Sequence, residues 1–190
     1  GEIVSEVIHA DQELDRNGDG KIQYVLLEGE AGHQDAIIRT DSVVRTIQGQ
    51  GIYLEKLSYQ FANWNRSQAE NKMLQLIHQY GGDIELVLCN NDEMAMGAVD
   101  AYEDEGYPLE ERPVIFGIDG LDGTLEAVKN GIIQGTVFND RQGQAEQIAR
   151  LATDLFKGNA LSGYDFVNER YIFLPYQKVT ISNVDTFMNR

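Results

Sequence analysis

The chain has 190 residues, of which 42% are hydrophobic and 24% charged, and its formal net charge is −16. The length and composition are those of one globular domain of ordinary size. The acidic excess repels phosphate backbones and anionic membranes, which argues against a nucleic-acid partner. A single cysteine, Cys89, rules out an internal disulfide, and with three scattered histidines it forms no zinc motif. No apolar stretch approaches the roughly 20 residues of a membrane-spanning helix.

Helix-like and strand-like patterns alternate along the chain. A helical pattern from Ile3 to Leu14 is followed by a short apolar strand, Gln23–Leu27. The later patterns predict helices over 35–48, 67–80, 92–105, 122–129 and 140–157, and strands over 53–59, 84–89, 113–118, 135–138, 171–174 and 178–181. This order predicts an α/β fold with a mostly parallel sheet and helices on both of its faces. In such folds, binding residues gather just beyond the carboxyl ends of the strands.

The segment between the first predicted helix and strand is typical of a calcium-binding loop. Asp15, Asn17 and Asp19 place side-chain oxygens at alternate positions, and Gly20 permits a sharp turn. Calcium prefers such oxygen ligands, at about 2.3–2.6 Å. An EF-hand loop has a bidentate glutamate at its twelfth position, where this chain has Leu26. The loop is therefore either an empty turn or is completed by a carboxylate from elsewhere.

Polar side chains follow five of the predicted strands, and one of these strands is also followed by the only tryptophan. Carboxylates accept hydrogen bonds from hydroxyls, guanidinium groups donate a fork of hydrogen bonds, and an indole stacks on the apolar face of a sugar ring. The set indicates carbohydrate recognition more than catalysis, since it contains no nucleophile with an adjacent base and no phosphate cradle. Its members are His33, Asp35, Arg39, Trp64, Asn91, Asp119 and Asn139.

Each of these side chains also has a purely structural interpretation. Trp64 is equally compatible with a core position. Arg39 is compatible with a surface ion pair to Glu30 or Asp35, and His33 with an ordinary loop position. Three of the predicted helices begin with an acidic residue that is a candidate N-cap: Asp35, Asp92 and Asp140. We prefer the capping interpretation for Asp92 and Asp140.

Four segments, together with the calcium-like loop, resemble the periplasmic galactose/glucose-binding proteins of ABC uptake and chemotaxis systems. They are Val25–Ala36, Asn90–Ala98, Phe116–Gly120 and Gly135–Asp140. The resemblance extends in order over nearly the whole chain. It implies a type I periplasmic-binding-protein fold and a non-enzymatic sugar-binding function.

The resemblance also implies residue roles. Trp64 would stack on the sugar, and the hydroxyls would be bound by His33, Asp35, Arg39, Asn91, Asp119 and Asn139. Calcium would be bound by Asp15, Asn17, Asp19, the Lys21 carbonyl and Gln23, with Glu85 supplying the missing carboxylate. Without the resemblance, Glu85 would pass as a polar residue at a strand edge.

The family has two lobes with sugar bound between them, and this chain resembles the C-terminal lobe. We expect the native start to be missing, since Gly1 is followed at once by a helical pattern. Residues of about 140–174 would belong to the absent N-terminal lobe, and their apolar faces favour a homodimer or domain swap. The resemblance implies an extracytoplasmic location, in the periplasm or lipid-anchored at the cell surface. It implies an ABC permease and a chemoreceptor as partners, and we expect the lone lobe to bind glucose or galactose weakly or not at all.

Three other functions are compatible with parts of the sequence. The effector domain of a sugar-responsive transcription regulator shares the fold, but the chain has no basic DNA-binding segment and a net charge of −16. A glycosidase would need paired carboxylates, for which Asp35, Asp92 and Asp119 are the candidates. A calcium sensor would need more than one incomplete loop. No feature of the sequence favours any of these three functions over sugar binding.

Overall fold

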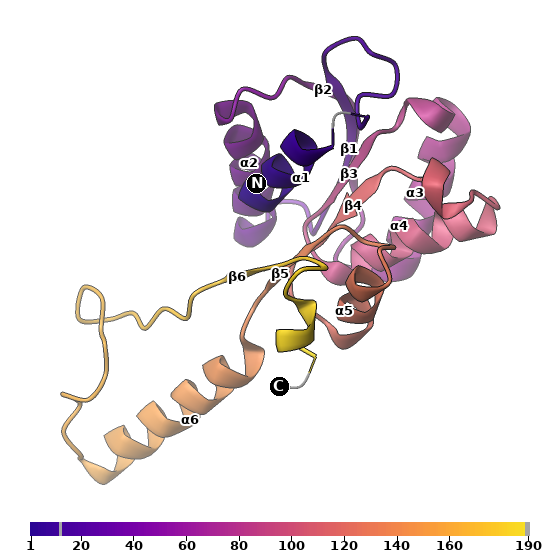
Figure 1. The fold of residues 1–190 in the computed structure, drawn as a ribbon. Helices are drawn as coiled ribbons and strands as arrows, with labels where there is room; N and C mark the ends of the chain where they lie inside the picture. Colours follow the sequence, from indigo (N-terminus) through magenta and orange to yellow (C-terminus); the bar gives the residue numbers. More distant parts are fainter. Residues whose placement is uncertain (12, 189–190) are drawn as a thin grey trace.

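In a computed structural model, which describes residues 1–11 and 13–188, a parallel sheet forms the centre of the protein (Figure 1). Its strands lie in the order β2-β1-β3-β4. Their bounds are β1 (Ile22–Glu28), β2 (Leu54–Phe61), β3 (Leu86–Cys89) and β4 (Val114–Phe116). Strand β5 (Thr136–Phe138) continues beside β4 through parallel bridges and pairs antiparallel with β6 (Gln177–Val179). The expected α/β fold with a mostly parallel sheet is confirmed.

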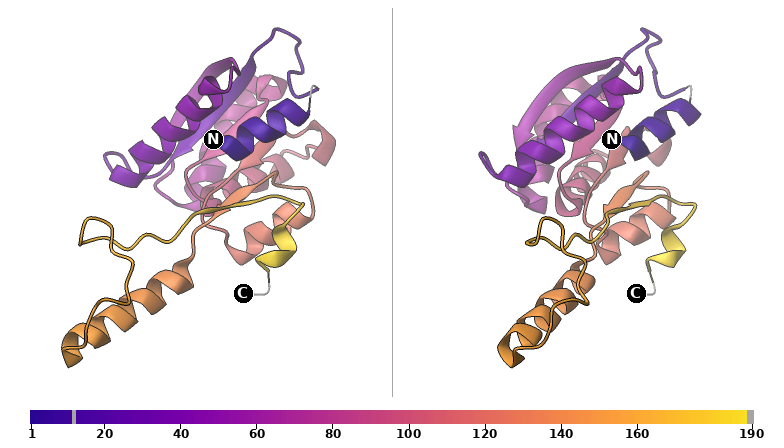
Figure 2. Two further views of the ribbon diagram at one scale, coloured as in Figure 1. Left: turned by 60° about the vertical axis from the view of Figure 1, so that its left-hand side comes forward. Right: turned by 90° about the vertical axis from the view of Figure 1, so that its left-hand side faces the viewer.

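Helices cover both faces of this sheet, as the views in Figure 2 show. One face carries α1 (Glu2–Ala10) and α2 (Gln34–Gly49), and the other carries α3 (Arg66–Tyr80), α4 (Asp92–Asp104) and α5 (Asp122–Lys129). The described part of the chain also has three short 3-10 helices: Gly81–Asp83, Leu109–Glu111 and, after β6, Val184–Thr186.

The central strand β1 explains why two layers of helices form. All seven of its residues are buried, because their side chains alternate between two separate hydrophobic cores. Val25 and Leu27 lie in the core shared with α3 and α4, and Tyr24 and Leu26 lie in the core shared with α1 and α2. A strand buried on both faces has a nearly continuous apolar sequence, which is the pattern of this segment.

The residues that begin the helices differ in part from those expected. Asp140 does cap α6 (Arg141–Lys157), accepting from the Gly143 amide at 2.9 Å. Asp92 does not cap α4, since Asn91 accepts from the Met94 amide at 3.0 Å. The expectation for Asp92 is therefore wrong. Asp35 does not cap α2 either, because His33, two residues earlier, is the N-cap and accepts from the Asp35 amide at 3.2 Å.

Helix α6 and residues 158–176 form an arm that extends away from the sheet (Figures 1 and 2). No residue of α6 is buried, and the Phe156 side chain is 92% exposed. The expected strand Tyr171–Leu174 is wrong: Tyr171 makes a single bridge to Val167, and regular pairing begins only at β6. The apolar sequence of this segment has no neighbouring strand with which to pair among the described residues.

Candidate functional site

Arg39 and Asp119 lie at the centre of a cluster of polar side chains beyond the carboxyl ends of the parallel strands. Arg39, on the second turn of α2, donates from Nη1 to the Asn90 carbonyl at 2.7 Å and lies 3.6 Å from Asp119 Oδ1. Their side chains are 17% and 27% exposed, so each retains a surface for another molecule. The alternative pairing of Arg39 with Glu30 or Asp35 does not occur. Burial raises the pKa of Asp119, and Arg39 opposes that shift.

Trp64 lies directly beside this pair. Its ring is 5.3 Å from the His33 ring, edge to face, and the Arg39 guanidinium carbon is 5.7 Å from its centroid. Trp64 is half-buried and also packs against the hydrophobic core, so the two interpretations of its role are compatible. Its backbone is left-handed, with φ of 61°, as is that of Asn63 at 52°. Such values are unfavourable for a bulky residue and indicate that the surrounding structure holds the indole in place.

The two asparagines of the predicted site lie at its border. Asn91 Nδ2 donates to the Trp64 carbonyl at 3.4 Å while its oxygen caps α4. The Asn139 amide donates to the Asp119 carbonyl at 3.1 Å, and its side-chain oxygen accepts from Gln144 at 2.6 Å. Both side chains thus hold neighbouring segments of the site in place, and in Asn91 the amide nitrogen and the oxygen are both engaged in these contacts.

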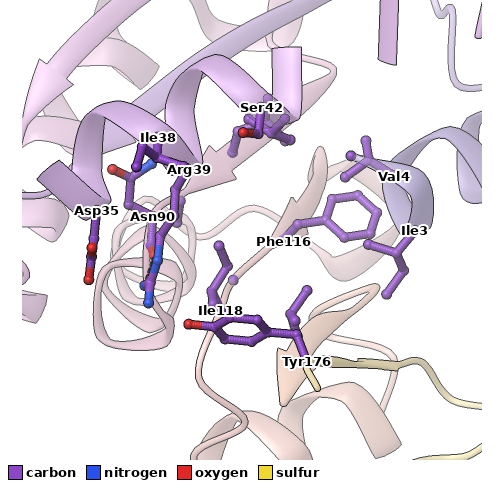
Figure 3. A pocket seen from close by; sticks show the side chains of 16 residues that line it. Ile3, Val4, Asp35, Ile38, Arg39, Ser42, Asn90, Phe116, Ile118 and Tyr176 are labelled. Atoms are coloured by element: carbon purple, nitrogen blue, oxygen red, sulfur yellow. Dashed lines mark hydrogen bonds between the residues drawn. The ribbon is translucent and has the colours of Figure 1, made fainter. Parts of the chain in front are cut away.

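A cavity of about 360 Å³ opens next to the Arg39–Asp119 pair (Figure 3). Its polar end is formed by Asp35, Arg39 and Asn90, and its far end by apolar side chains of α1 and β4. Tyr176, just before β6, also lines the cavity, with its hydroxyl toward Arg39 and Asn90 (Figure 3). Sequence reasoning missed Tyr176, because nothing in the pattern places the end of the arm beside α2.

The calcium-like loop folds around its own carboxylates. Asp15 accepts from the amides of Gly18 at 2.8 Å and Gly20 at 2.8 Å, and Asp19 accepts from the Lys21 amide at 2.9 Å. Asn17 accepts from the Asp19 amide at 2.9 Å. The loop is thus an ordered turn in which Asp15, Asn17 and Asp19 each accept hydrogen bonds from backbone amides of the same loop.

Glu85 lies against this loop, although it is distant in sequence. Its carboxylate accepts from the amides of Arg16 at 2.6 Å and Gln23 at 2.9 Å. Burial raises the pKa of Glu85, and the backbone donors oppose that shift. The structure therefore places Glu85 against the segment that contains the other five residues that the resemblance named. The Lys21 side chain points away and pairs with Glu55 at 2.8 Å.

The donor atoms of the loop have one feature that fits a metal ion. Among the described residues, no three His, Cys, Asp or Glu side chains gather as a metal site by themselves. However, Gln23 Oε1 is buried and has no hydrogen-bond partner, while Gln23 Nε2 donates to Asp19 at 2.9 Å. A buried acceptor without a donor is unfavourable, and it fits a cation whose shell also uses amide and carbonyl oxygens.

The chain resembles known proteins over most of its length. Residues 10–160 match the family model described as a periplasmic binding protein domain. The chain is 35% identical, over 99% of its length, to a D-galactose/methyl-galactoside binding periplasmic protein of Haemophilus influenzae. It is 33% identical, over 90% of its length, to a xylitol-binding protein of Mycolicibacterium smegmatis. It spans about half the length of these relatives, 56% and 46% respectively.

Solved structures show the same relationship. An ABC transporter solute binding protein from Bacillus halodurans, with bound myo-inositol, superposes with a TM-score of 0.78 at 29% identity. The match covers 94% of this chain and 58% of that one. Within the described residues, no helix has the length and apolar character needed to span a membrane.

Proposed function

The chain belongs to the family of periplasmic binding protein domains, and we propose that it is the C-terminal, sugar-binding lobe of an ABC solute-binding protein for a monosaccharide of the galactose/glucose class. The observation that carries the proposal is the Arg39–Asp119 pair with Trp64 beside it. The relatives named above are binding proteins, which supports binding rather than catalysis and gives no support to a transcription regulator.

The chemistry of this group suits a sugar with adjacent hydroxyls. The Arg39 guanidinium donates to neighbouring oxygens, and the Asp119 carboxylate accepts from hydroxyl groups. The half-exposed Trp64 indole offers an apolar surface for the C–H face of the ring. Further donors and acceptors for the sugar would come from His33, Asp35, Asn91 and Asn139.

We also propose that the loop binds a structural calcium ion. Asp15, Asn17, Asp19, the Lys21 carbonyl, Gln23 and Glu85 would hold it. A bound calcium would supply positive charge to the carboxylates of Asp15, Asp19 and Glu85. The support for this proposal is the contact between Glu85 and the loop, together with the buried and unpartnered Gln23 Oε1.

The remaining features concern the whole protein. We propose that residues of about 140–174 belong to a second lobe, which would cover the exposed side chains of α6 and close over the sugar. The intact protein would deliver sugar to an ABC permease outside the cytoplasm and signal to a chemoreceptor. The exposed apolar arm supports this division of the chain.

Calorimetry with D-galactose and D-glucose tests the sugar proposal. We expect millimolar affinity for the chain alone, since one lobe contacts only one side of a sugar. Asp119→Asn should weaken binding about tenfold or more, because it removes a charged acceptor. Asp122→Asn, whose side chain is 90% exposed, is the matched control and should bind as the unchanged chain does. Micromolar or tighter binding by the chain alone would contradict the division into lobes.

A further inference from the structure

Asp92 is a buried carboxylate to which neither the sugar site nor the calcium loop assigns a role. It is 0% exposed, at the start of α4. Oδ1 accepts from the Thr136 hydroxyl on β5 at 2.6 Å, and Oδ2 accepts from the Leu121 amide at 2.8 Å. The Gly120 amide also donates to it. A buried charge is tolerated where several donors satisfy it, and here they come from two separate segments.

The segment that Asp92 holds is the one that carries Asp119. Asp119 has φ of 135°, a conformation in which non-glycine residues are rare, and Gly120 follows with φ of 72°. The Asp119 amide donates to the Val137 carbonyl at 2.9 Å, and the Asp92 amide donates to the Ile118 carbonyl at 2.8 Å. Unfavourable backbone conformations persist where the surroundings enforce them.

The backbone at the end of β4 approaches the Asp92 carboxylate closely. A Cβ on Gly117 would lie 2.3 Å from Asp92 Oδ1, so the strand end approaches the carboxylate more closely than any larger residue permits. Thr136 is likewise 0% exposed. Asp92 therefore joins α4, the 117–121 segment and β5 at one buried point.

We propose that Asp92 is a positioning residue for sugar binding: it holds the Gly120–Leu121 turn and so directs the Asp119 carboxylate toward the sugar hydroxyls and Arg39. This proposal rests on the proposed function and extends it to a residue that does not touch the sugar.

The charge on Asp92 matters for this role. A carboxylate accepts from all three donors, whereas its protonated form must use one oxygen as a donor. Burial raises the pKa of Asp92 to about 6, against the pull of Thr136 and the turn amides. The titratable groups that face it are Asp119 on the turn and the buried Cys89 thiol at the end of β3. Sugar affinity should therefore fall as the pH drops through about 6, with Asp119 contributing in the same direction.

The test uses the 190-residue chain and two substitutions of the buried contact. Asp92→Asn removes the charge, and Thr136→Val removes one donor, while Thr136→Ser retains the hydroxyl and Glu93→Gln changes an exposed carboxylate next to Asp92 on α4. Three quantities are measured: galactose affinity between pH 5 and 8, melting temperature, and hydrogen exchange of the Gly120 and Leu121 amides.

We expect Asp92→Asn to weaken galactose binding about tenfold at pH 8, to flatten its pH profile and to accelerate exchange at Gly120 and Leu121. Thr136→Val should do so to a smaller extent, which keeps the test decisive if Asp92→Asn does not fold. Thr136→Ser and Glu93→Gln should match the unchanged chain.

A merely structural role would lower the melting temperature and speed hydrogen exchange throughout the chain. That result, or unchanged galactose affinity and unchanged exchange at the two amides, would overturn the proposal. If the unchanged chain bound no sugar, the proposed function would fail separately, and exchange at the two amides would still decide whether Asp92 holds the turn.

Discussion

At the scale of single residues, backbone strain and close contacts concentrate at the edge of the sheet. Besides Asn168 and Glu169 in the arm, three described residues other than glycine have positive φ, and they lie at this edge: Asn63, Trp64 and Asp119. Residues in such conformations store unfavourable energy of order 1–3 kcal/mol each and tend to occur where binding requires a preset geometry. Two of the three are residues of the proposed sugar site, which indicates that the site is organised before sugar arrives.

The position of Trp64 depends on the absence of a side chain at Gly29. A Cβ at Gly29 would lie 2.2 Å from the indole ring, so Gly29→Ala must displace Trp64. We expect a loss of stability of about 1–3 kcal/mol, as for other overpacked sites, and a shift of the Trp64 fluorescence maximum. Gly49→Ala is the control, because its Cβ would meet nothing within 4 Å. An unchanged emission spectrum in Gly29→Ala would show that the indole is not seated there.

The buried Asp92 predicts a pH dependence of stability. Its folded-state pKa of about 6 lies above the ordinary value of 3.8. Its contribution to the free energy of unfolding is therefore full below pH 3.8 and is lost as the pH rises through about 6. The difference in that free energy between the unchanged chain and Asp92→Asn should shrink by up to ~3 kcal/mol from pH 4 to pH 8. Urea denaturation at both pH values measures it, and a difference that grows with pH would contradict the burial of a charged group.

At the scale of elements, the Asp15–Gln23 loop connects three strands. Glu85 joins it to the start of β3, and the Arg16 guanidinium donates to the carbonyls of Glu111 and Arg112, just before β4. The loop leads directly into β1. Calcium at this loop would therefore stabilise the end of the sheet opposite the sugar edge.

Calcium should raise the melting temperature of the chain. A ligand at about 100 times its dissociation constant stabilises by about 2.7 kcal/mol, and each kcal/mol corresponds to roughly 2–4 °C in a domain of this size. Glu85→Gln should abolish most of that increase. Glu55→Gln, which changes a carboxylate paired with Lys21 outside the proposed shell, should retain it. Equal calcium responses in the two variants would rule Glu85 out as a ligand.

The elements show why part of this architecture could be predicted from the sequence. The apolar runs Gln23–Leu27 and 84–89 are local patterns, and the strands that they predict are present as β1 and β3. The cap of α4 was not predictable, because Asn90, Asn91 and Asp92 are all good capping residues and the choice depends on which one Thr136 satisfies. The prediction of a strand at Tyr171–Leu174 was wrong for a similar reason, since a strand needs a partner strand that the local sequence does not reveal.

At the scale of the whole molecule, the arm is the part of the chain that leaves large apolar side chains exposed to solvent. Ile148, Leu155, Phe156 and Phe173 are between 58% and 92% exposed. Within the arm, Tyr164 donates to Asp154 at 2.6 Å and stacks under Arg150, so its tip is held by its own contacts. The apolar side chains thus form an ordered surface against which a second lobe or a second copy of the chain could pack.

We predict that the chain alone self-associates through this arm. Contiguous exposed apolar side chains favour association, so light scattering should show dimers at high concentration. Phe156→Ser should shift the population to monomers. Tyr53→Ser, which removes another exposed aromatic residue far from the arm in sequence, should leave the dimers unchanged. A clean monomer at high concentration would refute the prediction.

The most direct test of the central claim uses the fact that Trp64 is the only tryptophan in the sequence. Its indole N–H gives one NMR resonance, which reports on the sugar site even when binding is weak. We predict that D-galactose moves this resonance in a saturable way, and that Arg39→Lys and Asp119→Asn weaken the response while Asp122→Asn does not. An indole resonance that stays in place in excess galactose would contradict the assignment of this edge as the sugar site.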